Sequence, residues 1–326
     1  MGGLSVSFRK VANRQSFAGD ETAESAVDQV SPATMIDARR EHAVIEAACW
    51  GTRGSIASPG PDTVGFGGNT PCLEIRVQDG RRFIFDAGTG IRPLGVSMMD
   101  EKGTSDAVVF LTHFHWDHIQ GFPFFMPLYD SDASVRIIGP DQAQADIKEL
   151  FTTQMASLNF PVPFTELSAK KEFSNLGGGV WEEDGFRVRA MRMRHPSFTV
   201  GHRVEYGGLS LAYMPDNELA GERYDVGEGW RRRLVDFLGD VDVLIHDAMF
   251  TEEEYGSKVD WGHSTFSQTV ELAHEAGAKK VLFFHHDPGR SDQELSEIVD
   301  SHRAQAAARG YSVEIGAAAE RDEIIG

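Results

Sequence analysis

Short apolar runs separated by polar turns dominate the chain from residue 43 onward. Some runs alternate between apolar and polar positions, and others are apolar throughout, as is typical of strands in a sheet packed between other layers. We therefore predict strands at 83–88, 107–113, 135–139, 186–195, 209–216, 241–247 and 280–286.

Helical periodicity appears in three stretches, 141–158, 264–277 and 291–310. The third stretch begins with a capping box of Ser291 and Glu294 and ends at Gly310. The expected apolar faces are Ile147, Leu150, Phe151, Met155 and Leu158, then Phe266, Val270 and Ala273, then Leu295, Ile298 and Val299. Strands and helices together predict a mixed α/β architecture.

Residues 1–40 are polar, rich in Ala, Ser, Asp and Glu, and have no sustained apolar period. Such a composition predicts a mobile N-terminal extension. The remainder, 41–326, is expected to form a single domain, since its apolar content is sufficient for one large core.

Composition and charge limit the classes of partner that the chain is expected to bind. The 326 residues carry a formal net charge of −19, which disfavours binding to polyanions and anionic membranes without a local basic patch. Cys49 and Cys72 are too few for a disulfide scaffold. No apolar run reaches the length of a membrane span and no secretory signal precedes the domain, so we expect a cytoplasmic protein that binds no membrane.

The ends of the predicted strands carry metal-ligating residue types. His113, His195, Asp216, Asp247 and His285 each lie at such an end. Strand ends can meet at one edge of a sheet, so residues distant in sequence can converge there. The alternative is that each polar residue only terminates its strand.

The segment "FLTHFHWDHIQG" (110–121) concentrates four such residues. His113 and His115, two apart in an extended segment, point the same way and can hold one ion, while Asp117 and His118 face a second position. Imidazole and carboxylate suit zinc, iron or manganese, and two ions need a bridging group and about six ligands. The candidates for the remainder are His195, Asp216 and His285.

"THFHWDH" resembles the H-x-H-x-D-H signature of the metallo-β-lactamase superfamily, and the similarity extends over residues 45 to about 320. "GTRGS" (51–55) and "GGNTPCLEI" (67–75) resemble its opening strands, and "DAGTG" (86–90) its early turn. The resemblance implies an αββα sandwich of two mixed β-sheets flanked by helices. It also implies two divalent metal ions, with zinc favoured and manganese or iron as alternatives. The implied ligands are His113, His115 and His195 for one ion, Asp117, His118 and His285 for the other, and Asp216 as the bridge; His286 competes with His285.

"GHSTFSQTVELAHEAGAKKVLFFHH" (262–286) is similar to the ribonuclease Z and phosphodiesterase branch of that superfamily. With "LIHDAMF" (244–250), it implies His263 as a proton donor oriented by Asp247. Asp117, His263 and Asp247 are therefore the catalytic candidates. Alternatively, Ser264 caps a helix after a surface His263, and Asp247 and His246 are structural.

The expected reaction is attack on a phosphodiester by a hydroxide that the metal ions hold. The resemblance to ribonuclease Z implies a long basic arm between the positions of His195 and Asp216, but only about twenty residues separate them here. We therefore expect a small phosphodiester substrate, such as a cyclic nucleotide, and no long nucleic acid. The aromatic residues of 121–129 and 158–167 could wall its pocket or belong to the core. The resemblance also makes a homodimer an expectation.

Two other functions fit the same residues. The metal site could hydrolyse a lactone, ester or thioester, a reaction that would survive loss of His263. Alternatively, the chain could be a metal-bearing regulatory or binding module without turnover, whose partner docks on residues 1–40.

Overall fold

The first of two seven-stranded sheets contains the strands that lead into the histidine-rich segment. The computed structural model describes residues 45–101, 103–141, 146–176 and 179–325; the predicted extension, 1–40, lies outside them. In spatial order the strands are β14 (Glu323–Ile325), β1 (Ile45–Gly51), β2 (Cys72–Val77), β3 (Arg82–Phe85), β4 (Ala107–Phe110), β5 (Ser134–Gly139) and β6 (Lys170–Asn175). Strands β3 to β6 are parallel and the other pairs are antiparallel, so the sheet is mixed.

The second sheet is also mixed. In spatial order its strands are β13 (Glu314–Ala317), β12 (Lys280–Phe284), β11 (Val243–Asp247), β10 (Leu209–Met214), β9 (Val200–Tyr206), β8 (Phe186–Arg192) and β7 (Val180–Glu183). Strands β10 to β13 are parallel, whereas β7 to β10 pair antiparallel. Gly207 and Gly208, both with positive φ, form a two-residue turn between β9 and β10. The segment between His195 and Asp216 is thus a compact hairpin.

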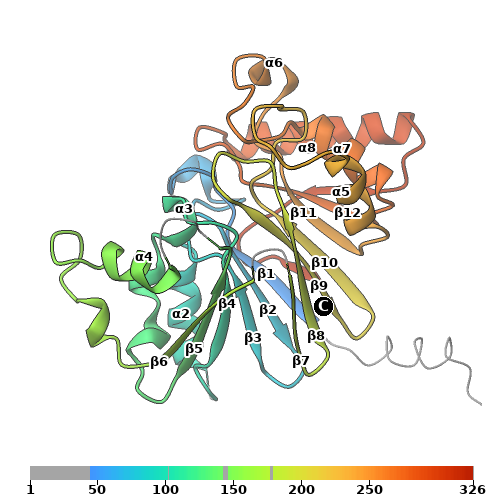
Figure 1. Cartoon of the computed structure of the whole chain (residues 1–326). Coiled ribbons are helices and arrows are strands. Elements are labelled where there is room, and N and C mark those ends of the chain that lie inside the picture. The colour runs from blue at the N-terminus through green and yellow to red at the C-terminus, as the bar shows by residue number, and fades with distance from the viewer. Residues whose placement is uncertain (1–44, 102, 142–145, 177–178, 326) are drawn as a thin grey trace, which may run out of the picture.

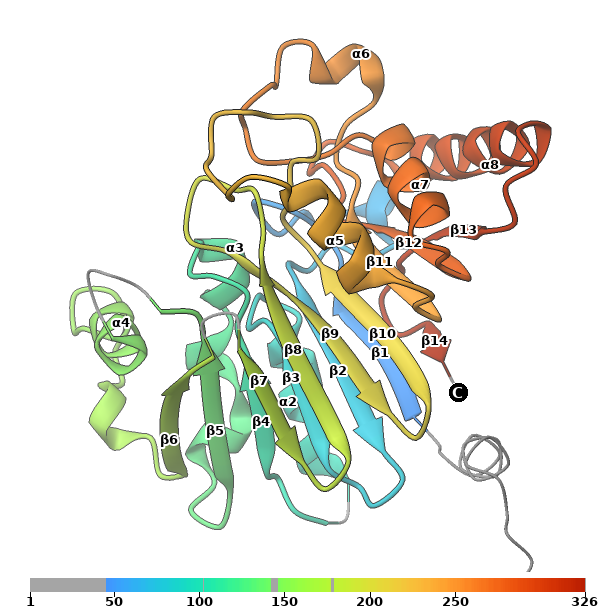
Figure 2. The same cartoon turned by 45° about the vertical axis from the view of Figure 1, so that its right-hand side comes forward.

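Helices cover the outer face of each sheet, as Figures 1 and 2 show. Against the first sheet pack α2 (Ile91–Asp100), α3 (Trp116–Ile119), α4 (Ile147–Gln154) and the 3-10 turns Phe122–Phe124, Met126–Tyr129 and Phe164–Glu166. Against the second pack α5 (Trp230–Leu238), α7 (Phe266–Glu275) and α8 (Asp292–Ala308). The short α6 (Glu252–Tyr255) lies above the sheet ends, and a further 3-10 turn is Pro61–Thr63. The αββα sandwich expected from the sequence is confirmed.

The core between the sheets is aromatic. Phe83 stacks on Phe186 with ring centroids 3.6 Å apart, and Phe85 stacks on Phe110 at 5.1 Å. These pairs and Tyr213 are fully buried, and the stacking of Phe83 on Phe186 joins the two sheets. The strand ends above this core are consequently held in register.

Most predicted elements are confirmed, with local differences at their ends. The predicted helix 141–158 is shorter, Ile147–Gln154, and Leu158 lies beyond its end and is 97% exposed, so its assignment to the apolar face was wrong. Residues 142–145 lie outside the described residues. The capping box of Ser291 and Glu294 is present, and Gly310 follows α8 with φ 73°. Within the described residues no helix is long and apolar enough to cross a membrane.

His202 is a buried histidine between Phe85 and Phe110, and in the part of the chain that the structure describes its Nδ1 has no hydrogen-bond partner. Burial lowers the pKa of His202 to about 3, whereas an unfolded histidine titrates near 6.5. Between these values the unfolded chain binds a proton that the folded chain does not, so stability falls as pH falls. Between pH 7 and pH 5 this costs about 2 kcal/mol.

We therefore expect His202→Phe to reduce the loss of unfolding free energy between pH 7 and pH 5 by about that amount. Urea denaturation at the two pH values measures the difference. An identical pH dependence in the variant and the natural chain would show that His202 is not the source.

Candidate metal centre

The first ligand group gathers three histidines from two strand ends. His113 follows β4 and is buried, His115 is the N-cap of α3 and is partly exposed, and His195 follows β8. His195 Nε2 lies 3.1 Å from His115 Nδ1, and the ring of His113 lies 4.5 Å from that of His115. Ligand atoms of a tetrahedral zinc ion are roughly 3.3 Å apart, because each bond is about 2 Å long. The three histidines can therefore share one ion.

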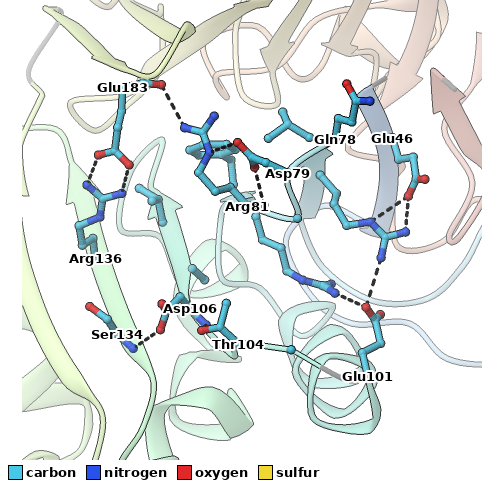
Figure 3. A pocket seen from close by; sticks show the side chains of 18 residues that line it. Glu46, Gln78, Asp79, Arg81, Glu101, Thr104, Asp106, Ser134, Arg136 and Glu183 are labelled. Atoms are coloured by element: carbon cyan, nitrogen blue, oxygen red, sulfur yellow. Dashed lines mark hydrogen bonds and ion pairs between the residues drawn. The ribbon is translucent and has the colours of Figure 1, made fainter. Parts of the chain in front are cut away.

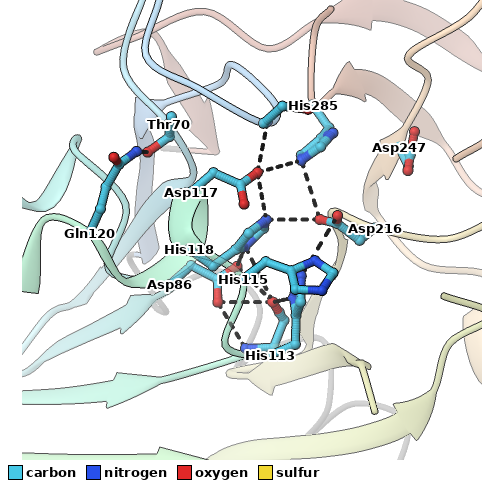
Figure 4. Close-up of polar contacts among 12 residues, drawn as sticks. Thr70, Asp86, His113, His115, Asp117, His118, Gln120, Asp216, Asp247 and His285 are labelled. Carbon is cyan, nitrogen blue, oxygen red and sulfur yellow. Dashed lines mark hydrogen bonds and ion pairs between the residues drawn. The ribbon is translucent and has the colours of Figure 1, made fainter. Parts of the chain in front are cut away.

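The second group lies beside it (Figure 4). Asp117 and His118 are in the first turn of α3, and His285 follows β12. Asp117 Oδ2 is 3.1 Å from His285 Nε2 and 3.4 Å from His118 Nε2. His286 points elsewhere, since its Nε2 donates to the carbonyl of Ala318 at 2.9 Å. Of the two candidates that the sequence left open, only His285 reaches this group.

Asp216 lies between the two groups. Its Oδ1 is 3.0 Å from His118 Nε2 and 3.5 Å from His285 Nε2, and its Oδ2 is 3.6 Å from His195 Nε2 and 3.9 Å from His113 Nε2. Burial raises the pKa of Asp216, but His285, His118 and His113 outweigh burial and hold this pKa well below its usual value. The carboxylate thus presents one oxygen to each group.

The polar atoms facing the centre are poorly satisfied by the protein itself. His113 Nε2, His118 Nε2 and Asp216 Oδ1 are buried and have no hydrogen-bond partner among the described residues, although two of them are 3.0 Å apart. Buried polar atoms without partners are costly, and atoms aimed at a common point are typical of metal ligands. The residues present therefore fit two divalent cations.

A buried network behind the ligands sets the orientation of two histidine rings. His118 Nδ1 donates to Asp86 Oδ2 at 2.8 Å, and Tyr213 donates its hydroxyl hydrogen to the same oxygen at 3.1 Å. Thr112 donates its hydroxyl hydrogen to Asp86 at 2.9 Å and accepts from His113 Nδ1 at 3.1 Å. Because each Nδ1 carries its proton, each Nε2 is free to bind a metal. In the sequence Asp86 is recognisable only as part of an early turn, and its contact with the ligand histidine is not predictable there.

His263 and Asp247 form a pair at the edge of the two groups. His263 Nδ1 is 2.7 Å from Asp247 Oδ2, and the ring of His263 lies 4.8 Å from His285 and 5.4 Å from His195. Burial lowers the pKa of His263, but Asp247, Asp216 and Asp117 outweigh burial and raise it to about 9. His263 is therefore a protonated group that faces the centre near neutral pH.

Two alternatives from the sequence are wrong. Thr265, not Ser264, is the N-cap of α7, where it forms a capping box with Gln268. His263 is buried rather than a surface residue.

His246 is buried, and its Nε2 is 3.1 Å from the side-chain amide of Asn217, so its contacts are structural.

The aromatic residues proposed for a pocket wall belong largely to the core. Phe122, Phe125 and Phe164 are buried in the layer outside the first sheet, whereas Phe124 is 49% exposed. Trp116 and Trp261, which adjoin Asp117 and Gly262 in the sequence, are 65% and 56% exposed.

A cavity of about 840 Å³ lies at the opposite, N-terminal ends of β3, β4 and β5 (Figure 3). Its arginines are already paired with carboxylates: Arg136 with Glu183 at 2.8 Å, Arg81 with Asp79 at 2.8 Å, and Arg82 with Glu74 at 2.6 Å. None of the predicted site residues lines it. The cavity is separate from the candidate metal centre.

Gly54 makes room for the ring of His285. A Cβ at residue 54 would lie 2.3 Å from His285 Nδ1. We expect Gly54→Ala to displace this ring, to weaken binding of one metal ion about tenfold or more, and to leave the other ion in place. Isothermal titration of the metal-free chain measures both affinities.

Gly60→Ala is the matched control, because a Cβ there meets nothing within 4 Å. Equal metal affinities in Gly54→Ala and Gly60→Ala would contradict the assignment of His285.

Comparisons with known proteins find similar chains in one family. The family profile of the Beta-lactamase superfamily domain matches residues 81–286. The protein named Ribonuclease Z of Limosilactobacillus fermentum is 27% identical over 270 residues, which cover 67% of this chain and 82% of that protein.

Two solved structures share the fold. The metallo-beta-lactamase fold protein YhfI of Bacillus subtilis has a TM-score of 0.60 at 17% identity, with 86% of this chain and 99% of that chain covered. The short form of human tRNase Z has a TM-score of 0.57 at 19% identity, with coverage of 86% and 98%. Two of these relatives bear the names Ribonuclease Z and tRNase Z, which weigh against the expected absence of a long nucleic acid substrate, so that expectation remains a proposal. The chain belongs to the β-lactamase superfamily and, as predicted, is a metal-dependent hydrolase with the metallo-β-lactamase fold.

Proposed function

We propose that the chain is a phosphodiesterase that uses two divalent metal ions and acts on a small phosphodiester, with cyclic nucleotides as the expected class. The observation that carries this proposal is the position of His263, which Asp247 holds at 2.7 Å beside both ligand groups. A phosphodiester releases an alkoxide, which needs a proton as the bond to phosphorus breaks. A protonated histidine next to two cation sites meets that need.

Each residue of the centre has a distinct role in the proposed reaction. The groups His113, His115, His195 and Asp117, His118, His285 would hold the two ions, and Asp216 lies within reach of both groups. When bound, zinc or a similar ion neutralises phosphate oxygens and provides a nucleophile near neutral pH. Asp117 keeps its charge through His118 and His285 and accepts a hydrogen bond from the amide of Ser55 at 2.8 Å. His263 donates its proton to the leaving oxygen, and Asp247 orients its ring.

Two features support a small substrate. The hairpin of β9 and β10 occupies the segment in which the resemblance to ribonuclease Z implied a basic arm. The chain also carries a net charge of −19, which repels a long phosphate backbone. The two cations still attract one phosphate, since they dominate the local field.

The test compares substrates on the zinc-reconstituted chain. We expect turnover of bis(p-nitrophenyl) phosphate and of at least one cyclic nucleotide, with little cleavage of a precursor transfer RNA. Efficient cleavage of the precursor would overturn the small-substrate proposal. Turnover of a lactone or thioester alone, unchanged in His263→Ala, would replace it with the carboxylic-ester alternative.

A further inference from the structure

Three consecutive residues after β10 serve three different parts of the centre. Asp216 lies between the ligand groups, Asn217 donates its amide hydrogen to Asp247 at 3.1 Å, and Glu218 turns to the segment 255–262. Glu218 is fully buried. The sequence marks it only by its place after Asp216.

The carboxylate of Glu218 accepts three hydrogen bonds from one segment. Its Oε1 accepts from the hydroxyl of Tyr255 and the amide of Asp260, both at 2.7 Å, and its Oε2 accepts from the amide of Gly262 at 2.9 Å. Within the described residues, no arginine or lysine nitrogen lies within 4 Å of the Glu218 carboxylate. Burying a carboxylate is costly unless hydrogen bonds compensate. The segment must therefore adopt a conformation that directs these three donors at Glu218.

The same segment supports the metal centre from behind. The carbonyl of Gly262 accepts a hydrogen bond from His195 Nδ1 at 3.0 Å, and the next residue is His263. The contact is close, because a Cβ on Gly262 would lie 2.5 Å from His195 Nδ1. Residues 256–262 contain neither helix nor strand, so tethers rather than regular structure hold them in place.

We propose that Glu218 is a positioning residue that anchors segment 255–262, so that the carbonyl of Gly262 orients His195 toward its metal ion and His263 stays beside the reacting phosphate. Metal ligands depend on such outer contacts, and their loss typically weakens metal binding about 10- to 100-fold. The part that concerns His263 rests on the proposed function, whereas the part that concerns His195 does not. The anchor predicts a selective effect on one of the two ions.

The experiment uses Glu218→Gln in the full chain. A glutamine has nearly the same volume, but its Nε2 would face amide donors instead of accepting from them. We expect one of two zinc equivalents to bind about 10- to 100-fold more weakly, while the other keeps its affinity. Zinc titration against a competing chelator dye measures both zinc affinities without any substrate. Glu253→Gln, an exposed glutamate on α6, is the matched control and should bind as the natural chain does.

Two milder variants keep the proposal testable if Glu218→Gln does not fold. Tyr255→Phe removes one of the three hydrogen bonds and should weaken the same equivalent by a few-fold, and Gly262→Ala should weaken it through the contact with His195. Normal binding of both equivalents by folded Glu218→Gln, or by both milder variants, would overturn the proposal. A natural chain that binds two zinc ions but hydrolyses no phosphodiester would contradict the proposed function and leave the anchoring of His195 intact.

Discussion

Replacing Asp216 with asparagine is expected to lower phosphodiester turnover about a thousandfold, which corresponds to roughly 4 kcal/mol of transition-state stabilisation. Asp216 lies between the two ligand groups and presents one oxygen to each. Asparagine offers a single neutral oxygen and places an NH₂ group where the second ligand oxygen was. The number of bound metal ions should therefore fall below two, as elemental analysis of the purified variant measures.

Asp236→Asn on the exposed face of α5 is the control for loss of one negative charge. It should keep both the metal content and the turnover of the natural chain. Full metal content with normal turnover in Asp216→Asn would remove Asp216 from the centre.

Replacing His263 with alanine is expected to slow release of a poor leaving group much more than release of a good one. General acid catalysis contributes about 10²- to 10⁴-fold when the leaving group is an alkoxide. p-Nitrophenolate is stable without a proton, so bis(p-nitrophenyl) phosphate should lose about tenfold or less in kcat. The measurement is kcat for a cyclic nucleotide and for the nitrophenyl ester in the same preparation. An equal loss for both substrates would indicate that His263 positions the substrate and donates no proton.

The pH dependence of the natural chain follows from the same group. His263 must be protonated to act, so kcat/KM should fall as pH rises through its pKa. The contacts of His263 raise this pKa to about 9, and bound cations nearby would lower it. The falling limb is therefore expected below pH 9, and it should disappear in His263→Ala.

The local histidine cluster was predictable because its geometry is local. Residues 113 and 115 point the same way in an extended segment, and a helical turn then brings Asp117 and His118 to the other side. His195, Asp216 and His285 were predictable as candidates because strands end just before them. Sequence alone could not choose between His285 and His286, since that depends on which ring turns inward: His285 has φ 59° and His286 bonds to Ala318.

The supporting residues were not predictable for a physical reason. Asp86 meets His118, Thr112 and Tyr213, and Tyr213 comes from the other sheet, so the network exists only once the sheets pack. Glu218 likewise contacts a segment about forty residues further along the chain. The aromatic residues of 121–129 and 158–167 could not be assigned to a core or a pocket from the sequence. An apolar side chain can serve either until its neighbours are known.

We propose that these two ligand groups hold two ions on which phosphodiester hydrolysis depends. The most direct test strips the purified chain of metal and follows hydrolysis of bis(p-nitrophenyl) phosphate while zinc is added in steps. We expect negligible turnover without metal and a rise that levels off at two equivalents per chain. Absence of turnover at every metal loading, or turnover that is the same without metal, would contradict it.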